Sequence, residues 1–359
     1  MTITVLVAVI AAIILITAVW KIHPLPVLLL GGFVFGVWHN GSVLKTLDLL
    51  SSGFGNTIRS IGIVIIAGTL IGVFMEQRGA LKVIARKIIG VTGEKRTPLA
   101  MSIIGYIVSI CIFCDSAFII LIRLWRKIGT LAKLPLAVGA TALSMGLFAS
   151  HCFIPPTPGP LAAMSILSAD FGHVLLFGSL AALGATVAGY LYAVHFGKNE
   201  ILESPDEASI PVAEKEVEFQ HHWSIAFLPV IIPLVLIGAN SIVTLFKDSL
   251  PPLFVNFMAA AGHPIPALTI GALLAIFGIG SCHREELTVD GLVGKGVVDA
   301  ANILVITGAG GAFGEVLKHV DFTALLPGKV GNIGVFALLI PLGFASILKI
   351  AQGSSTLAI

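Results

Sequence analysis

Charged residues are scarce in this chain. Asp, Glu, Lys and Arg make up 11% of its 359 residues, whereas hydrophobic residues make up 57%. A soluble domain usually carries about 25% charged residues, so this chain has too few to cover a surface in water. The composition excludes an ordinary soluble protein and indicates that lipid surrounds most of the sequence. The formal net charge of +2 is small, and we expect no nucleic-acid partner.

Cysteine is also rare, and signatures of catalysis are missing. The four cysteines fall in or beside apolar stretches, so we interpret them as packing residues. The sequence holds no HExxH, GxSxG or paired-aspartate signature. It therefore predicts no metal and no other cofactor. A membrane-embedded enzyme that uses Asp115 and His151 remains a less favoured alternative function.

The sequence contains several long runs of uncharged, mostly apolar residues. About 20 apolar residues cross a bilayer. Residues 2–20 are uncharged and no basic region precedes them, so they indicate a first membrane span rather than a secretory signal. Later runs of the same kind predict further spans at 22–44, 60–75, 171–197, 223–246, 265–281 and 300–314, with another apolar run at 330–348.

Two segments between these spans have their own patterns. Residues 76–96 place six basic residues between apolar residues at helical spacing. This is typical of an amphipathic helix on the cytoplasmic membrane surface. The next run, 97–122, is apolar except for Asp115 and has basic residues on both flanks. A re-entrant hairpin would keep both flanks inside, so we favour it over an ordinary span.

The run 134–169 contains no Asp, Glu, Lys or Arg but is too long for one helix. Four prolines fall within six of its residues, at positions 155, 156, 158 and 160. Each proline lacks an amide hydrogen and clashes with the preceding turn. The pattern predicts a broken helix, which at membrane depth must be buried in protein or line a wet cavity.

Two motifs recur on either side of an acidic linker at 198–222. The sequence HPLP at 23–26 matches HPIP at 263–266, and AGTLIG at 67–72 matches AGGAFG at 309–314. For His23 and His263 we expect structural roles at the starts of spans. Counting spans from a cytoplasmic 76–96 sets span 300–314 antiparallel to 60–75. Inverted repeats with broken helices are the architecture of secondary transporters.

These patterns predict the fold class. We expect an all-α polytopic membrane protein that is an inverted repeat of transmembrane helices with re-entrant hairpins and broken helices. The first transmembrane repeat would be 1–197, the cytoplasmic acidic linker 198–222, and the second, incomplete repeat 223–359.

Five motifs resemble the gluconate permease (GntP, gluconate:proton symporter) family of the ion transporter superfamily. The resemblance runs from about residue 2 to the end, in the family's order, and the proline-rich motif is the most specific part. The motifs are GFGNT at 53–57, FCDSAF at 113–118, SHCFIPPTPGP at 150–160, GAGGAF at 308–313 and AQGS at 351–354.

The resemblance implies a secondary active transporter of the bacterial inner membrane. It would import gluconate or a related sugar acid by proton symport, and one branch of the family carries D-serine. Its partners would be the sugar acid, protons and the lipid bilayer, and the resemblance also makes a homodimer an expectation. Family sites are built from re-entrant hairpins and unwound helices.

The chain departs from the family pattern in three ways. Thr157 stands where the family often has His, and Cys152 stands where it has Gly, which bears on substrate identity and proton handling. The sequence also ends at Ile359, inside what looks like the second hairpin. An inactive, truncated remnant of such a permease is therefore an alternative function.

A sugar acid needs positive potential for its carboxylate and neutral groups for its hydroxyls. The amides at the starts of broken helices supply the first. Asp115 is expected to carry the coupled proton or to cap the hairpin tip, and His151 to relay a proton, bind substrate or satisfy a carbonyl. The remaining candidate residues for substrate or proton binding are Ser116, Ser150, Pro155, Pro156, Thr157, Gly159, Gln352, Gly353, Ser354, Ser355 and Thr356.

Overall fold

The computed structural model describes residues 2–93, 96–110, 112–131, 134–197, 219, 222–320, 342–343 and 345–346. Within those ranges the chain folds into helices and contains no β-strand, which confirms the all-α class. It divides into two compact units that are described separately below. Unit 1 comprises residues 1–63, 161–168 and 301–359, and unit 2 comprises residues 64–160 and 169–300.

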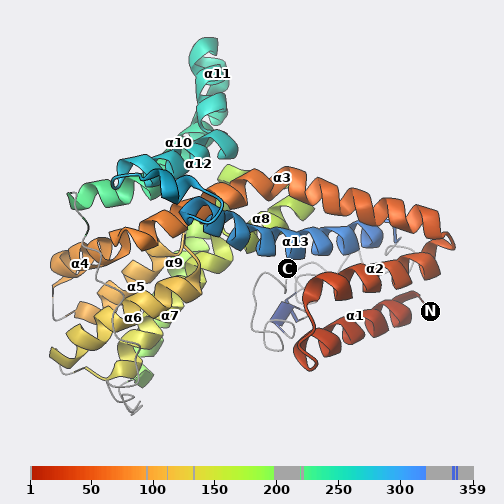
Figure 1. Cartoon of the computed structure of the whole chain (residues 1–359), viewed down its shortest axis with the longest axis horizontal. Coiled ribbons are helices and arrows are strands. Elements are labelled where there is room, and N and C mark those ends of the chain that lie inside the picture. Colours follow the sequence, from red (N-terminus) through yellow and green to blue (C-terminus); the bar gives the residue numbers. More distant parts are fainter. Residues whose placement is uncertain are drawn as a thin grey trace. The chain divides into compact units, whose positions relative to one another are not determined.

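Local signals set the helix boundaries at the start of unit 1. His23 accepts a hydrogen bond from the second amide of the next helix, and Pro24 occupies the first helical position, where its missing amide hydrogen costs nothing. Gly41 ends that helix in the left-handed conformation, with φ of 65°. These signals delimit α1 (Thr2–Ala18), α2 (Pro24–Asn40) and α3 (Val43–Gln77); α1 and α2 lie side by side (Figure 1).

Glycines bring the first half of α3 against the end of α13 (Leu292–Lys318) within unit 1. A Cβ atom added to Gly53 would lie 2.6 Å from the carbonyl oxygen of Gly311, and one added to Gly311 would lie 1.9 Å from Thr57 Oγ1. Small residues of this kind let helix backbones approach closely in membranes. The motifs at 53–57 and 308–313 therefore form a helix crossing.

Unit 2 is a bundle in which α5, α7 and α9 pack along one another (Figure 1). A Cβ atom on Gly146 would lie 2.3 Å from the carbonyl oxygen of Ser102, so α5 and α7 are in backbone contact there. Trp125 is fully buried and donates its indole N–H to the Leu136 carbonyl at 3.1 Å. The helices are α4 (Ala80–Thr92), α5 (Thr97–Val108), α6 (Cys114–Leu131), α7 (Leu136–Phe153) and α9 (Phe171–Phe196). The first three residues of α8 (Pro158–Leu167) also belong to unit 2, and the rest of α8 belongs to unit 1.

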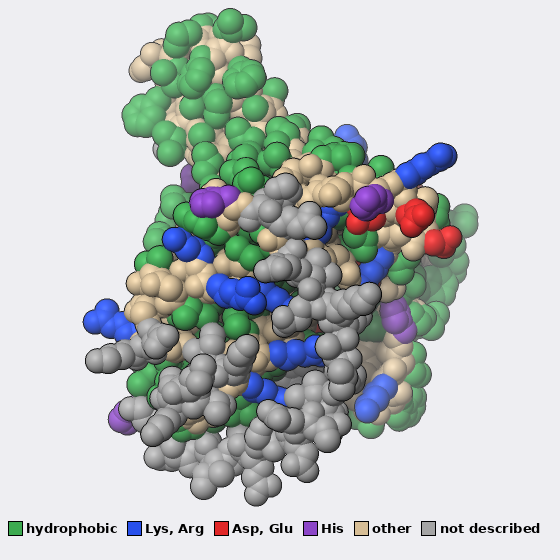
Figure 2. Space-filling model, turned by 60° about the vertical axis from the view of Figure 1, so that its left-hand side comes forward, with side chains coloured by type: hydrophobic (Ala, Val, Ile, Leu, Met, Phe, Trp, Pro, Cys, Tyr) green, Lys and Arg blue, Asp and Glu red, His purple; other side chains and the backbone are tan. Residues whose placement is uncertain are grey.

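The remainder of unit 2 begins after the acidic linker. It consists of α10 (Trp223–Leu245), a short turn (Lys247–Ser249), α11 (Pro252–Ala261), α12 (Pro264–Leu273), a π turn (Leu274–Gly278) and a 3-10 turn (Arg284–Leu287). Helix α11 projects from its neighbours, and hydrophobic side chains cover it (Figures 1 and 2). Leu253 is 84% exposed and Phe257 is 64% exposed, as expected of side chains that face lipid.

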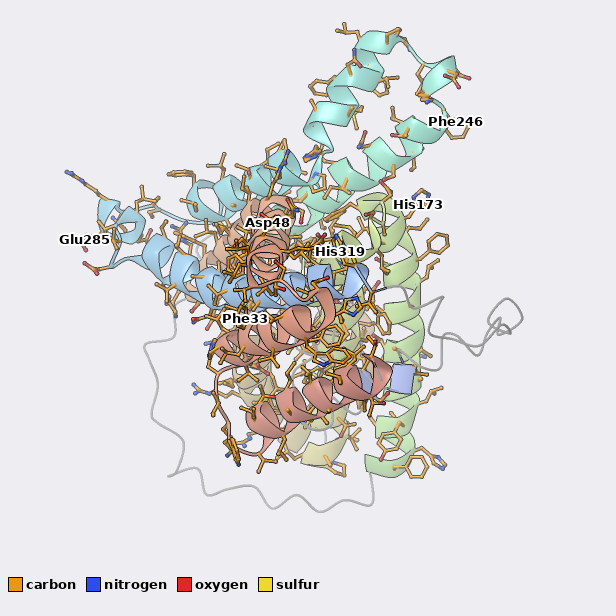
Figure 3. All side chains as sticks on the ribbon, turned by 90° about the vertical axis from the view of Figure 1, so that its right-hand side faces the viewer. Phe33, Asp48, His173, Phe246, Glu285 and His319 are labelled. Atoms are coloured by element: carbon orange, nitrogen blue, oxygen red, sulfur yellow. The ribbon has the colours of Figure 1, made fainter. Side chains whose placement is uncertain are left out.

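A buried ion pair joins the end of α3 to the turn before α13. Arg78 Nη2 lies 2.9 Å from Glu286 Oε2, and the Arg78 guanidinium also sits 5.2 Å from the centre of the Phe74 ring. The neighbouring Glu285 is exposed on the outside of this turn (Figure 3). The pair connects positions 208 residues apart.

Amphipathic helix α4 is confirmed. Its apolar side, which includes Leu81 and Ile84, is buried against the bundle, while Arg86 is exposed. Lys87 holds its ammonium group 4.3 Å from the centre of the Trp223 ring on α10, a cation–π contact. The position of α4 on a membrane surface stays a prediction.

The predicted spans agree with the structure in part. Helices α1 and α2, expected as spans at 2–20 and 22–44, have 17 residues each and are not among the helices long enough to cross a membrane. Among the described residues, five helices are long and apolar enough to cross a membrane, or six if α11 and the helix after it, bent by 60°, count as one. The segment expected at 60–75 is the second half of the 35-residue α3, and α11 was not predicted. The run 97–122 is divided between α5 and α6, as a hairpin requires. The run 330–348 and nearly all of 198–222 lie outside the described residues.

The two HP motifs have the same local structure. His263 accepts from the Ile265 amide at 3.3 Å, and His23 accepts from the Leu25 amide at the same distance. Pro264 occupies the first position of α12, as Pro24 does in α2. Both histidines therefore have the structural role expected of them. The inverted arrangement of the repeats, and the division at 198–222, stay predictions.

Candidate functional site

A recess in unit 2 lies where two helix breaks meet α3. It is partly open, and its cavity volume is about 20 Å³. One wall comes from α3, the second from the break between α5 and α6, and the third from the break between α7 and α8. The lining residues are Ile65, Gly68, Thr69, Ile110, Ile112, Phe113, Pro156, Thr157 and Pro158.

The break between α7 and α8 follows directly from its prolines. Helix α7 ends at Phe153, the Ile154 amide still donates to the Ser150 carbonyl at 2.9 Å, and α8 starts at Pro158. The Pro155–Pro156 peptide bond is cis. The residues from 154 to 160 are all buried. The predicted broken helix is therefore confirmed, and it is buried in protein.

The break between α5 and α6 contains no proline. The Ser109 hydroxyl donates to the Ile112 carbonyl at 3.3 Å, which closes the turn after Val108. Phe113 stands at the tip, and its ring meets the ring of His151 edge-on, with centroids 6.4 Å apart. The hairpin tip and the proline break are thus in direct contact.

The structure brings together most of the site residues predicted from the first half of the chain. Pro156 and Thr157 line the recess, Pro155 and Gly159 are buried beside them, and His151 contacts the recess through Phe113. Ser150 is fully buried, and its hydroxyl has no hydrogen-bond partner among the described residues. An unpaired buried hydroxyl costs free energy, but Ser150 does not line the recess, and its part in binding stays a prediction.

Asp115 lies outside the recess. It is exposed in the first turn of α6, and its carboxylate accepts a weak hydrogen bond from the Cys114 thiol at 3.6 Å. A carboxylate in the first turn is favourable because it faces the positive end of the helix dipole. Ser116 is half-buried beside it. The position matches the hairpin-cap alternative, and the proton-carrying role of Asp115 stays a prediction.

The second half of the predicted site lies outside the described residues. It consists of Gln352, Gly353, Ser354, Ser355 and Thr356. No group of three or more His, Cys, Asp or Glu side chains that could hold a metal ion occurs within the described ranges.

Seven of the nine lining residues were not among the predicted site residues, and Gly68 and Thr69 are two of the seven. Gly68 and Thr69 line the recess from α3, and a Cβ atom on Gly68 would lie 3.6 Å from Pro156 Cγ. Both belong to the repeated AGTLIG motif, which indicated a repeat but not a site. Packing decides which face of α3 meets the recess, so the sequence offered no way to choose these two positions.

A chain of apolar helices, with membrane-length spans and a recess walled by two helix breaks, defines a multi-pass membrane transport protein. Comparison with known sequences gives the family: residues 1–359 match the family described as GntP family permease. The chain therefore belongs to the GntP family, a family of permeases rather than enzymes.

Individual relatives agree with this assignment. An uncharacterized permease of Haemophilus influenzae is 32% identical over 94% of this chain and 72% of its own length. A gluconate permease of Pseudomonas aeruginosa is 29% identical over 98% of this chain and 79% of its own length. The D-serine transporter DsdX of Escherichia coli is 28% identical over 97% of this chain and 78% of its own length. The chain is a multi-pass protein of the bacterial inner membrane.

Proposed function

We propose that this permease imports gluconate or a related sugar acid by proton symport. The observation that carries the proposal is the recess, where the proline break and the hairpin tip converge on α3. Helix breaks of this kind form substrate sites in secondary transporters, because they free backbone groups at membrane depth. The gluconate permease from Pseudomonas aeruginosa supports the choice of substrate class.

The polar groups around the recess suit such a substrate. Ser150 contributes a buried hydroxyl that has no hydrogen-bond partner among the described residues. Thr157 contributes another hydroxyl, at the break between α7 and α8. His151 stands next to the hairpin tip through Phe113, where it can bind a substrate hydroxyl or pass on a proton. Gln352, Ser354, Ser355 and Thr356 complete the proposed set from the second half of the chain.

Asp115 is the proposed carrier of the coupled proton. It is the acidic residue at the start of α6, next to the hairpin tip that lines the recess. A carboxyl group on a membrane hairpin can exchange a proton as its surroundings change between outward-open and inward-open states. Neutralising it should therefore uncouple sugar-acid uptake from the proton gradient.

The test is uptake of labelled gluconate in cells that lack their own gluconate carriers. We expect accumulation that a protonophore abolishes. Asp115→Asn should abolish accumulation as well. Asparagine has nearly the same shape as aspartate, and loss of one exposed charge at the start of a helix costs only about 0.3–1 kcal/mol, so the fold should remain intact. Asp48→Asn is the matched control, because Asp48 is an exposed aspartate of α3 (Figure 3), and it should behave as wild type.

Three outcomes would contradict the proposal. Uptake that resists the protonophore would exclude proton symport. Full accumulation by Asp115→Asn would exclude Asp115 as the proton carrier. If the membrane-inserted protein takes up neither labelled gluconate nor other labelled aldonates, the substrate class is excluded.

A further inference from the structure

The recess offers two hydroxyl groups, and the protons of both are already engaged. Thr69 Oγ1 donates to the Ile65 carbonyl, four residues earlier on α3, at 2.8 Å. Thr157 Oγ1 donates to the Ile154 carbonyl at the proline break. A threonine hydroxyl has one proton to donate and two lone pairs that accept. Toward a ligand in the recess, both threonines therefore act as hydrogen-bond acceptors.

The rest of the lining supplies no donor side chain to balance these acceptors. The other lining side chains are those of isoleucine, phenylalanine, glycine and proline. Pro156 and Pro158 also lack backbone amide hydrogens. Among the described residues, no Lys, Arg or His side chain lines the recess. Of these side chains, a carboxylate would meet only hydrogen-bond acceptors and apolar groups, and burial of an unpaired charge is strongly unfavourable.

We propose that this recess receives the hydroxyl-bearing end of the substrate, with the carboxylate held outside it, and that Thr69 determines specificity by accepting a substrate O–H. The proposal rests on the proposed function, because it orients the sugar acid within that same site. A polyol chain brings the O–H donors that the two threonines require. The isoleucines and Phe113 pack against its carbon backbone.

The absence of a side chain at Gly68 leaves space for this end of the substrate. A Cβ atom at position 68 would lie 3.6 Å from Pro156 Cγ, an ordinary van der Waals contact. A methyl group there is compatible with the fold but fills space between α3 and the proline break. Gly68→Ala should therefore discriminate against longer substrates, and three-carbon ligands should still enter.

The first experiment compares gluconate with 6-deoxygluconate, which lacks the hydroxyl farthest from the carboxylate. Each is used to compete with labelled gluconate for uptake by the full chain. Wild type should bind 6-deoxygluconate about three- to tenfold more weakly, the effect of one neutral hydrogen bond. In Thr69→Val this preference should disappear, because valine has nearly the same shape as threonine but cannot accept a hydrogen bond. Thr69→Ser should restore it.

Thr46→Val is the matched control for this experiment. Thr46 is a fully buried threonine on α3 whose hydroxyl donates to the carbonyl four residues earlier, as that of Thr69 does, at 2.9 Å. It does not line the recess. The preference for gluconate over 6-deoxygluconate should remain in Thr46→Val.

The second experiment tests the room beside Gly68. Gly68→Ala should weaken competition by gluconate more than competition by glycerate, a three-carbon hydroxy acid. Gly62→Ala is its control, because a Cβ atom there would meet only Ile58 of the same helix, at 3.5 Å. Equal effects on both ligands would overturn the assignment of Gly68.

The outcomes separate this inference from the proposed function. If wild type imports gluconate and Thr69→Val keeps the full preference over 6-deoxygluconate, the orientation is wrong and the proposed function stands. Equal binding of the two ligands by wild type also overturns the orientation. If wild type imports no sugar acid, both proposals fall together.

Discussion

The ion pair between Arg78 and Glu286 gives the sharpest prediction about stability. The two side chains are 9% and 25% exposed, and their charged atoms lie 2.9 Å apart. Glu286 Oε2 also accepts the His283 amide at 3.2 Å, which fixes the carboxylate within its turn. The pair thus ties the turn at 284–287 to the end of α3, so its loss should weaken unit 2.

The expected loss in the free energy of unfolding lies between two limits. Removing one partner of a fully buried pair costs about 3–5 kcal/mol, whereas an exposed pair contributes about 0.2–1 kcal/mol. Glu286 retains a quarter of its exposure, so water still screens the charge in part. We therefore expect Arg78→Met and Glu286→Gln each to lower the free energy of unfolding by about 2 kcal/mol.

The assay is a double-mutant cycle measured by reversible unfolding in mixed detergent micelles. The double variant should lose about 1–2 kcal/mol less than the sum of the single variants, because each single change removes the same contact. Glu285→Gln is the matched control, since that carboxylate is exposed on the same turn (Figure 3), and it should stay within about 0.5 kcal/mol of wild type. Losses that add to within about 0.3 kcal/mol would refute the coupling.

Two further predictions concern packing and an unpaired hydroxyl. Gly146→Val should prevent accumulation of folded protein, because a Cβ atom at position 146 would lie 2.3 Å from the Ser102 carbonyl oxygen. The measurement is size-exclusion chromatography of a fluorescent fusion. Gly184→Ala is the control and should leave the elution profile unchanged, because a Cβ atom at position 184 would have no neighbour within 4 Å. Ser150→Ala should leave the thermal unfolding temperature unchanged or raise it, because the buried Ser150 hydroxyl has no described partner, and it should raise the KM for gluconate. A lower unfolding temperature would indicate a structural role instead.

One wall of the candidate site, the proline break, could be predicted from the sequence, because it depends on a covalent property of the chain. Proline cannot continue a helix, so the break at 154–157 follows from the positions of the prolines alone. Burial of Pro155, Pro156, Thr157 and Gly159 follows in turn, since a break inside a long apolar run must be covered by protein. A re-entrant hairpin at 97–122 was predicted from the basic flanks, and it stays a prediction. The break between α5 and α6 could not be placed from the sequence, because it contains neither proline nor glycine.

The extent of the helices was less predictable. The sequence indicated a span at 60–75, but α3 begins at Val43, because charged residues such as Lys45 and Arg59 mark an expected bilayer edge and do not interrupt helical hydrogen bonding. Helix α11 was missed because its ten residues are too few for a span.

The sequence by itself determined that this protein belongs in a membrane, that it is helical, and that one helix is broken at the prolines. These properties depend on composition and on local backbone chemistry. Tertiary structure alone decided that Gly68 and Thr69 face the proline break, that Phe113 meets His151, and that Arg78 pairs with Glu286. Such contacts join residues far apart in the chain, and which face of a helix meets which neighbour is fixed only when the helices pack.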